Sequence, residues 1–201
     1  MKTRLLFIAI PVKILLISSL LAITTGCSKS KNDDSSATYY YKAKIGGEDR
    51  SEKVTSSNSI QAGSITNGFD KVECVAFISP DVPNQANALI ISKGMLSNYL
   101  SISQEQFLAF FTPGSYSYTT GSGNGFTVTW IDADGKLWAS DNGTGDQAGS
   151  TIQIISASPD PNAIDYYVRV KVVFNCKLYK EGTGEMKQLT SGEFVGLFGF
   201  V

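Results

Sequence analysis

Histidine is absent from this chain of 201 residues, and its absence limits the chemistry that the other side chains can perform. Histidine is the commonest general base near neutral pH and the commonest metal ligand in proteins. Without it, serine nucleophiles lack their usual partner, and a hydrolase would have to rely on a pair of carboxylates. No acid pair framed by aromatic residues stands out, so we predict no catalytic residue and no enzymatic activity.

The region from Phe126 to Ser150 contains the residues best suited to bind a ligand. They are two tryptophans and four aspartates: Trp130, Trp138, Asp132, Asp134, Asp141 and Asp146. An exposed tryptophan beside loops rich in Asp, Asn and Gly is typical of a face that binds a sugar or another small ligand. The alternative is that both tryptophans are cross-strand partners in the core.

The turn between the two tryptophans distinguishes these alternatives. Its residues 132–135 (DADG) suit a type I turn followed by a glycine bulge, which pairs Asp132 with Lys136 and places Trp130 opposite Trp138 on one face. A two-residue loop would instead place Trp130 opposite Leu137 and turn Trp138 to the other face. The turn chemistry favours the first register and therefore two core tryptophans.

The aspartates of this region also raise the question of a bound metal. Clustered loop carboxylates are typical calcium ligands, but the spacing here differs from the twelve-residue loop flanked by helices. Asp and Gly are equally expected in hairpin turns for backbone reasons. We therefore predict no cofactor, with calcium as the alternative. The glycines at 121, 123 and 125 are followed by a predicted strand, so they indicate a hairpin connection and not a phosphate loop.

The amino terminus is typical of an export signal. Lys2, Arg4 and Lys13 precede a ten-residue apolar run, 14–23, that is too short to span a bilayer. Small residues then lead into Cys27, which resembles the cysteine that is acylated in bacterial lipoproteins. We expect residues 1–26 to be a signal peptide and Cys27 to be the site of lipid attachment, which would anchor the protein to the outer membrane. The alternative is an ordinary signal peptide.

The residues after Cys27 are polar and predict a flexible tether over 27–38. Lys31, Asp33 and Asp34 resemble the surface-export signal of Bacteroidota lipoproteins, and a generic linker is an equal alternative. The sequence therefore leaves the periplasmic and the cell-surface face both open.

Charge and length limit the remaining possibilities. Loss of three of the 17 basic residues with the signal peptide leaves 14 against 18 acidic residues, a formal charge of −4. No basic stripe is visible, so we expect no nucleic-acid partner. The remainder, 39–201, fits one domain with a single core.

Two further cysteines, Cys74 and Cys176, lie at inward-facing positions of predicted strands. An oxidising compartment favours a disulfide between them, which would close a loop of about 100 residues and contribute ~4 to 5 kcal/mol in the chain-entropy model. The alternative is two separate buried thiols.

Alternating Val, Ile, Thr, Tyr and Phe bounded by Gly, Asn, Asp and Pro predict an all-β fold from residue 39 onward, an antiparallel β-sandwich or flattened barrel. Strands are expected at 39–45, 50–55, 60–66, 71–79, 88–92, 99–103, 114–118, 126–131, 136–140, 150–156, 167–179, 186–190 and 193–200. Only 103–111 predicts a helix, with Ser103 and Gln106 forming a capping box.

Several short motifs together resemble small Bacteroidota lipoproteins of unknown function. They are Lys44–Gly47, Leu100–Ser103, Pro113–Tyr116, the Trp130–Trp138 hairpin, Gly149–Ile154 and Leu189–Phe194. The long strand 174–179 departs from this pattern, where a glycine-containing strand is expected. The resemblance implies an all-β lipoprotein and supplies no activity.

These observations predict a lipid-anchored envelope protein that binds a glycan or a partner protein without catalysis. One alternative is a structural or accessory subunit of an outer-membrane assembly, which an exposed apolar patch without a pocket would favour. The other is a carboxylate-dependent hydrolase, which would need a pocket with two acids about 5 to 9 Å apart.

Overall fold

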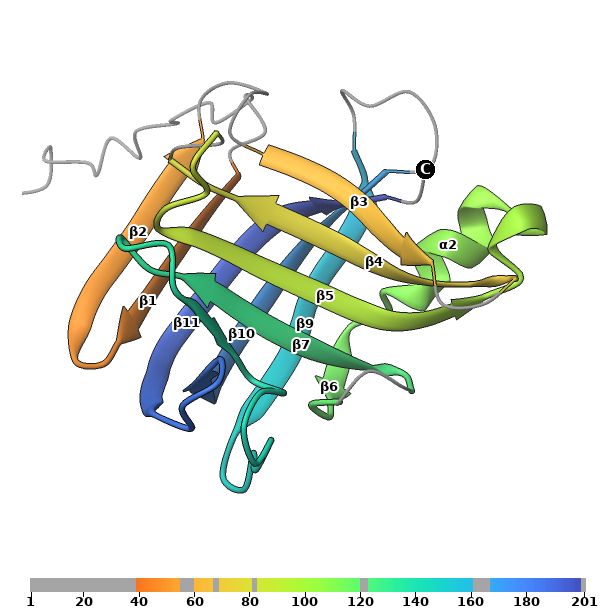
Figure 1. Cartoon of the computed structure of the whole chain (residues 1–201). Helices are drawn as coiled ribbons and strands as arrows, with labels where there is room; N and C mark the ends of the chain where they lie inside the picture. Colours follow the sequence, from red (N-terminus) through yellow and green to blue (C-terminus); the bar gives the residue numbers. More distant parts are fainter. Residues whose placement is uncertain are drawn as a thin grey trace, which may run out of the picture. The chain divides into compact units, whose positions relative to one another are not determined.

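The computed structural model describes residues 39–54, 60–66, 69–80, 83–119, 123–160 and 167–199. All of them belong to a compact unit formed by Ala37–Val201. Eleven strands in this unit form an antiparallel sheet that curls into a half-barrel (Figure 1). The predicted all-β fold is thereby confirmed. The predicted signal peptide, 1–26, and tether, 27–38, with Cys27, lie outside the described residues.

The strands follow the order β2-β1-β11-β10-β8-β7-β5-β4-β3 across the sheet, and β9 pairs with β10 and with β6. The strands are β1 Tyr39–Ile45, β2 Glu48–Val54, β3 Ile60–Thr66, β4 Lys71–Ile78, β5 Ala88–Ser97, β6 Gly114–Tyr116, β7 Gly125–Ile131, β8 Leu137–Ala139, β9 Thr151–Pro159, β10 Val168–Lys180 and β11 Met186–Phe198. Curling brings β3 and β4 into contact with β11 across the interior.

The alternating pattern of β10 explains why the sheet has one dry and one wet face. Its apolar side chains point inward and are at most 4% exposed: Val168, Val170, Val172, Phe174, Cys176 and Leu178. The residues between them, including Lys171, Asn175 and Lys177, are half-buried on the outer face. Full burial of such an aliphatic or aromatic side chain contributes ~1.5 to 3 kcal/mol, so this face drives the packing of the half-barrel.

Helix α2, Gln104–Phe110, closes one end of the half-barrel (Figure 1). The predicted capping box is confirmed: Gln106 N–H donates to Ser103 Oγ, and Ser103 N–H donates to the Gln106 side chain. The helix inserts Phe107 into the core, and Phe111 follows it there; neither is exposed. The two rings meet edge to face with centroids 5.3 Å apart, which fixes the short helix against the sheet.

The predicted and observed elements differ most in three regions. Residues 99–101 form the 3₁₀ helix Tyr99–Ser101 and not a strand, because Asn98 takes a left-handed conformation that turns the chain. Residues 186–198 form one strand, in which a bulge near Ser191 replaces the predicted break. The strand predicted to end at Ser92 continues to Ser97.

The predicted disulfide is wrong. Cys74 and Cys176 do face the interior, with no exposed surface, but both are free thiols. They lie on β4 and β10, which are not paired with each other in the sheet. Burial raises the pKa of each thiol to about 12, so both behave as small apolar core residues.

Candidate functional site

The Trp130–Trp138 hairpin has the predicted three-residue turn. Asp132 N–H donates to the Lys136 carbonyl at 3.0 Å, Gly135 has a φ of +73°, and Trp130 pairs directly with Trp138. The tryptophans are 3% and 4% exposed, and their ring centroids are 6.5 Å apart. The core interpretation is therefore confirmed, and the exposed tryptophan platform is wrong.

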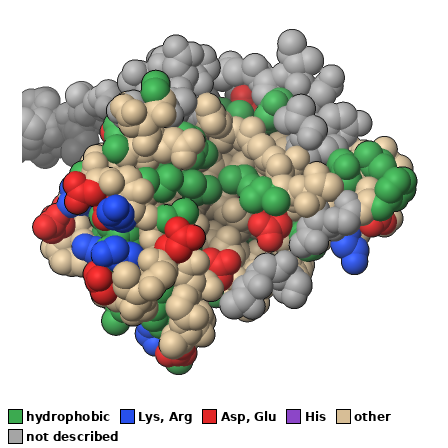
Figure 2. Space-filling view, viewed as in Figure 1, with side chains coloured by type: hydrophobic (Ala, Val, Ile, Leu, Met, Phe, Trp, Pro, Cys, Tyr) green, Lys and Arg blue, Asp and Glu red, His purple; other side chains and the backbone are tan. Residues whose placement is uncertain are grey.

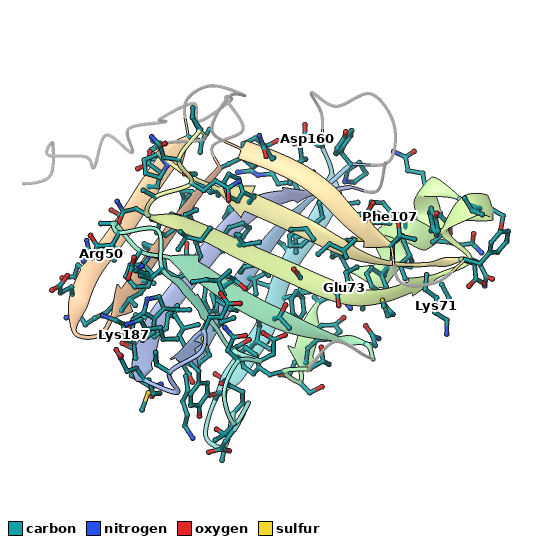
Figure 3. All side chains as sticks on the ribbon, viewed as in Figure 1. Arg50, Lys71, Glu73, Phe107, Asp160 and Lys187 are labelled. Carbon is teal, nitrogen blue, oxygen red and sulfur yellow. The ribbon has the colours of Figure 1, made fainter. Side chains whose placement is uncertain are left out.

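Cationic side chains lie over this tryptophan pair. Arg50 of β2 is 5.8 Å from the Trp130 ring centroid, and Lys187 of β11 is 4.6 Å from that of Trp138. Figure 3 shows Arg50 and Lys187 at the same end of the half-barrel. Lys180 adds a third cation 5.6 Å from the Trp138 ring. These three side chains and the two tryptophans form what we call the rim cluster.

The aspartates of this region have structural partners. Asp132 accepts the Trp138 indole N–H at 2.9 Å and the backbone N–H groups of Asp134 and Lys136. Although burial raises the pKa of Asp132, these bonds outweigh it and lower the pKa overall. Its oxygens therefore shape the turn and hold the tryptophan.

The other aspartates are spread over different contacts. Asp146 pairs with Lys177 at 2.8 Å, a bond that lowers the pKa of its carboxyl. Asp141 lies near Glu73 of β4, whose pKa is raised by burial and by the Asp141 charge. Asp134 is exposed in the turn. Within the described part of the chain, no group of three or more Cys, Asp or Glu side chains is arranged to hold a metal ion.

A groove of about 730 Å³ lies elsewhere, on the outer face of the sheet. It runs across β9, β10 and β11, and β1 and β6 contribute at its edges. The described lining residues are Lys42, Ser115, Tyr116, Ser150, Thr151, Ile152, Gln153, Val173, Phe174, Asn175, Ser191, Gly192 and Glu193. Hydroxyl, amide and charged groups therefore surround a short apolar floor.

Glu193 is the one acid among these described lining residues, and it is held as a carboxylate. It accepts a hydrogen bond from the Tyr40 hydroxyl and pairs with Lys171 at 3.1 Å and Lys42 at 3.2 Å. The Tyr40 hydroxyl and then the two ammonium groups lower the pKa of Glu193 to about 2, against the opposing effect of burial. The groove thus contains a fixed negative charge between two positive ones.

The bulge in β11 shapes the floor of the groove. Ser191 has a φ of +53°, a left-handed conformation that costs a non-glycine residue on the order of 1 kcal/mol or more. Gly192 follows, and a Cβ there would lie 2.7 Å from the Phe174 ring. The bulge exposes the Ser191 hydroxyl on the groove side at the expense of local strain, and such strain is frequent at ligand-binding positions.

Tyr116 lies at the edge of the groove on β6, and its ring is on the inner side of the sheet, where it faces a buried lysine. Lys93 of β5 has no exposed surface, and its Nζ is 4.5 Å from the Tyr116 ring centroid. The rings of Phe110 and Phe126 lie 3.9 and 5.3 Å from the same nitrogen, and Asn124 Oδ1 accepts its hydrogen bond. We call Lys93 with these three rings the lysine cage.

Sequence reasoning identified neither the groove nor the cage. The groove residues come from five separate segments, and their hydrophilic side chains look like an ordinary wet face. Lys93 did carry a signal, because it follows Leu89 and Ile91 at inward-facing positions. Because the predicted strand ends at Ser92, the pattern was not extended to Lys93, and its burial was not predicted.

The two ends of the half-barrel differ in surface character. Basic and acidic side chains gather at the end with the β1–β2 hairpin, and hydrophobic ones at the end with α2 (Figure 2). Three large hydrophobic residues are exposed: Ile65 of β3 by 55%, Phe69 before β4 by 89%, and Leu100 of the 3₁₀ helix that precedes α2 by 65%. No helix in the described ranges is long and apolar enough to cross a membrane.

Comparison of the chain with protein-family models, with curated proteins and with solved structures finds no match.

Proposed function

We propose that the protein is a lipid-anchored envelope protein that binds a glycan, without catalysis, in the groove across β9, β10 and β11. Support for the anchor comes from the export signal and Cys27, and from the resemblance to small Bacteroidota lipoproteins. On this proposal the molecule is held at the outer membrane through acylated Cys27.

The observation that carries the proposed binding is the chemical make-up of the groove. Sugars present closely spaced hydroxyl groups that both donate and accept hydrogen bonds. Lys42 offers donors and the exposed Gln153 offers an amide that both donates and accepts, while Val173 supplies an apolar surface. Glu193 retains lone pairs beyond those used by its lysines. Such a mixture of polar groups around a small apolar area suits a sugar unit better than an apolar ligand.

A glycan array probed with the full-length protein in detergent tests this function. We expect a small set of related glycans to bind, and Gln153→Ala and Lys42→Ala to weaken that binding at least threefold. Lys136→Ala is the matched control, because Lys136 is also an exposed lysine but lies in the tryptophan hairpin away from the groove lining. Equal loss in the control variant, or no glycan bound by the wild-type protein, would count against the proposal.

A second candidate is an accessory subunit of an outer-membrane assembly. The exposed side chains of Ile65, Phe69 and Leu100 favour it, because large apolar groups left in contact with water often mark a contact with another protein. Cross-linking in intact cells distinguishes the two functions. A partner that is cross-linked through a photoreactive residue at position 100, and is no longer captured when Phe69→Ser is added, would favour the accessory role over glycan binding.

A further inference from the structure

Lys93 is the one buried ammonium among the described side chains, and its cover is thin. Phe126 on the inner side is fully buried, whereas Phe110 and Tyr116 are half-buried and Asn124 is exposed. A single layer of side chains therefore separates the ammonium from solvent. Movement of Tyr116 and Asn124 alone would bring water to it.

The wall that carries Tyr116 is held by backbone hydrogen bonds as well as by side chains. Strand β6 pairs with β9, the Ser117 carbonyl accepts the Phe126 N–H at 3.0 Å, and the Thr119 N–H donates to the Phe126 carbonyl at 3.1 Å. The Tyr116 ring packs edge to face on Phe126 at 5.4 Å, and its hydroxyl donates to the Thr112 carbonyl at 2.6 Å. The Lys93 side chain completes the packing, with its Nζ 4.5 Å from the Tyr116 ring centroid.

We propose that Lys93 is a positioning residue for the groove: the lysine cage holds the Tyr116 wall in place, and opening of the cage moves that wall and exposes the ammonium. The part that concerns a ligand rests on the proposed function. The cage and its opening do not, because they can be measured on the protein alone.

The proton linked to this opening has a defined sign. Burial lowers the pKa of Lys93 to about 8, while the open cage returns the ammonium to water and to an ordinary pKa of 10.5. Opening therefore takes up a proton between about pH 8 and 10.5, and the cage opens less as the pH rises through that window. Below pH 8 the ammonium is charged in both states and opening is insensitive to pH.

The other groups facing Lys93 do not titrate in the lower part of this window. Cys74, its cross-strand neighbour on β4, has a pKa raised by burial to about 12. Burial also raises the pKa of Tyr116 above its ordinary value of 10. Phe110 of α2, Phe126 of β7 and Asn124 carry no charge. Glu73 acts on Cys74 but lies on the opposite face of β4 from Lys93.

Pulsed hydrogen exchange on the full-length protein without ligand tests the inference. For peptides covering 112–119 we expect protection, corrected for intrinsic exchange, to be constant from pH 6.5 to 7.5. It should then rise by up to about tenfold per pH unit above pH 8. The β1–β2 hairpin, 39–54, is the internal control and should show no such rise.

Two variants distinguish the effect of the Lys93 charge from the effect of ring packing on the protection of 112–119. Lys93→Met keeps the stem without the charge and should abolish the pH dependence, whereas Tyr116→Leu should leave 112–119 poorly protected at every pH. A pH-independent wild type, or the same dependence in Lys93→Met, would overturn the inference. If Lys93→Met does not fold, the pH dependence of protection in the wild-type protein alone supports or overturns the inference. Failure of glycan binding would leave this measurement unaffected.

Discussion

Cations lie over aromatic rings in two places in this protein, and the surroundings of the charge differ between them. In the rim cluster Arg50, Lys180 and Lys187 are half-exposed, and each has an acid nearby. Arg50 pairs with Glu48, Lys180 is 3.2 Å from Glu185, and the Lys187 charge acts on Asp132. Water and carboxylates therefore share these charges.

The lysine cage has neither of these compensations. Lys93 is fully buried, and its one hydrogen-bond acceptor in the described structure is the neutral amide oxygen of Asn124. Removing an ammonium from water has a large unfavourable free energy, and the attraction to ring faces offsets only part of it. A cation over a ring therefore has little effect on stability in the rim cluster, whereas it destabilises the folded state in the lysine cage. This contrast predicts opposite results when the charges are removed.

The largest effect should follow removal of the ring that the rim cations cover. Trp130→Ala deletes a side chain that is 3% exposed and leaves a cavity beside Trp138. We expect a loss of ~3 to 5 kcal/mol in the free energy of unfolding, measured by urea denaturation. A loss below ~1 kcal/mol would mean that the tryptophans are not part of the core.

Removal of the cage charge should have the next largest effect, with the opposite sign. Lys93→Met keeps the apolar stem and is expected to raise the free energy of unfolding by ~3 kcal/mol at pH 7, from a pKa lowered from 10.5 to about 8. The gain should shrink as the pH rises above 8, because the wild-type lysine is then neutral in the folded state. Destabilisation at pH 7 would show that the rings outweigh desolvation.

Glu193 provides a third case, because its partly buried carboxylate is paired with Lys42 and Lys171 and accepts a hydrogen bond from Tyr40. Its pKa is lowered from 4.5 to about 2, so its contribution is complete above pH 4.5 and is lost as the pH falls toward 2. We expect Glu193→Gln to reduce stability by ~1 to 3 kcal/mol at pH 7 and by little at pH 2. Equal losses at both pH values, in acid denaturation followed by circular dichroism, would assign the effect to packing.

The smallest effect is expected at the rim. Lys187→Met removes a half-exposed charge 4.6 Å from the Trp138 ring and should change stability by less than ~1 kcal/mol at any pH between 6 and 10. Thermal unfolding of this variant beside Lys93→Met is the direct test. A change as large as that of Lys93→Met would remove the distinction between the two clusters.

Local chemistry explains which elements could be predicted from the sequence. Residues 132–135 set the hairpin register, and Ser103 with Gln106 set the helix start, because each signal lies within a few residues of its effect. The strand β10 alternates over its whole length, and its observed bounds differ from the predicted 167–179 by one residue at each end.

The groove and the cysteines depend on contacts between distant parts of the chain. Lys42 and Glu193 meet only because β1 pairs with β11, and no sequence pattern encodes that pairing. The alternating pattern correctly predicts that Cys74 and Cys176 are buried, but it does not show which strands face each other across the interior. The disulfide prediction failed for that reason.

Both tryptophans of the sequence lie at the hairpin end of the half-barrel, and neither lines the groove. Intrinsic fluorescence of this protein is therefore a local optical probe. Excitation at 295 nm samples only the indoles beneath Arg50 and Lys187, so a sugar seated across β9 to β11 will leave the emission unchanged unless the far end of the sheet moves with it.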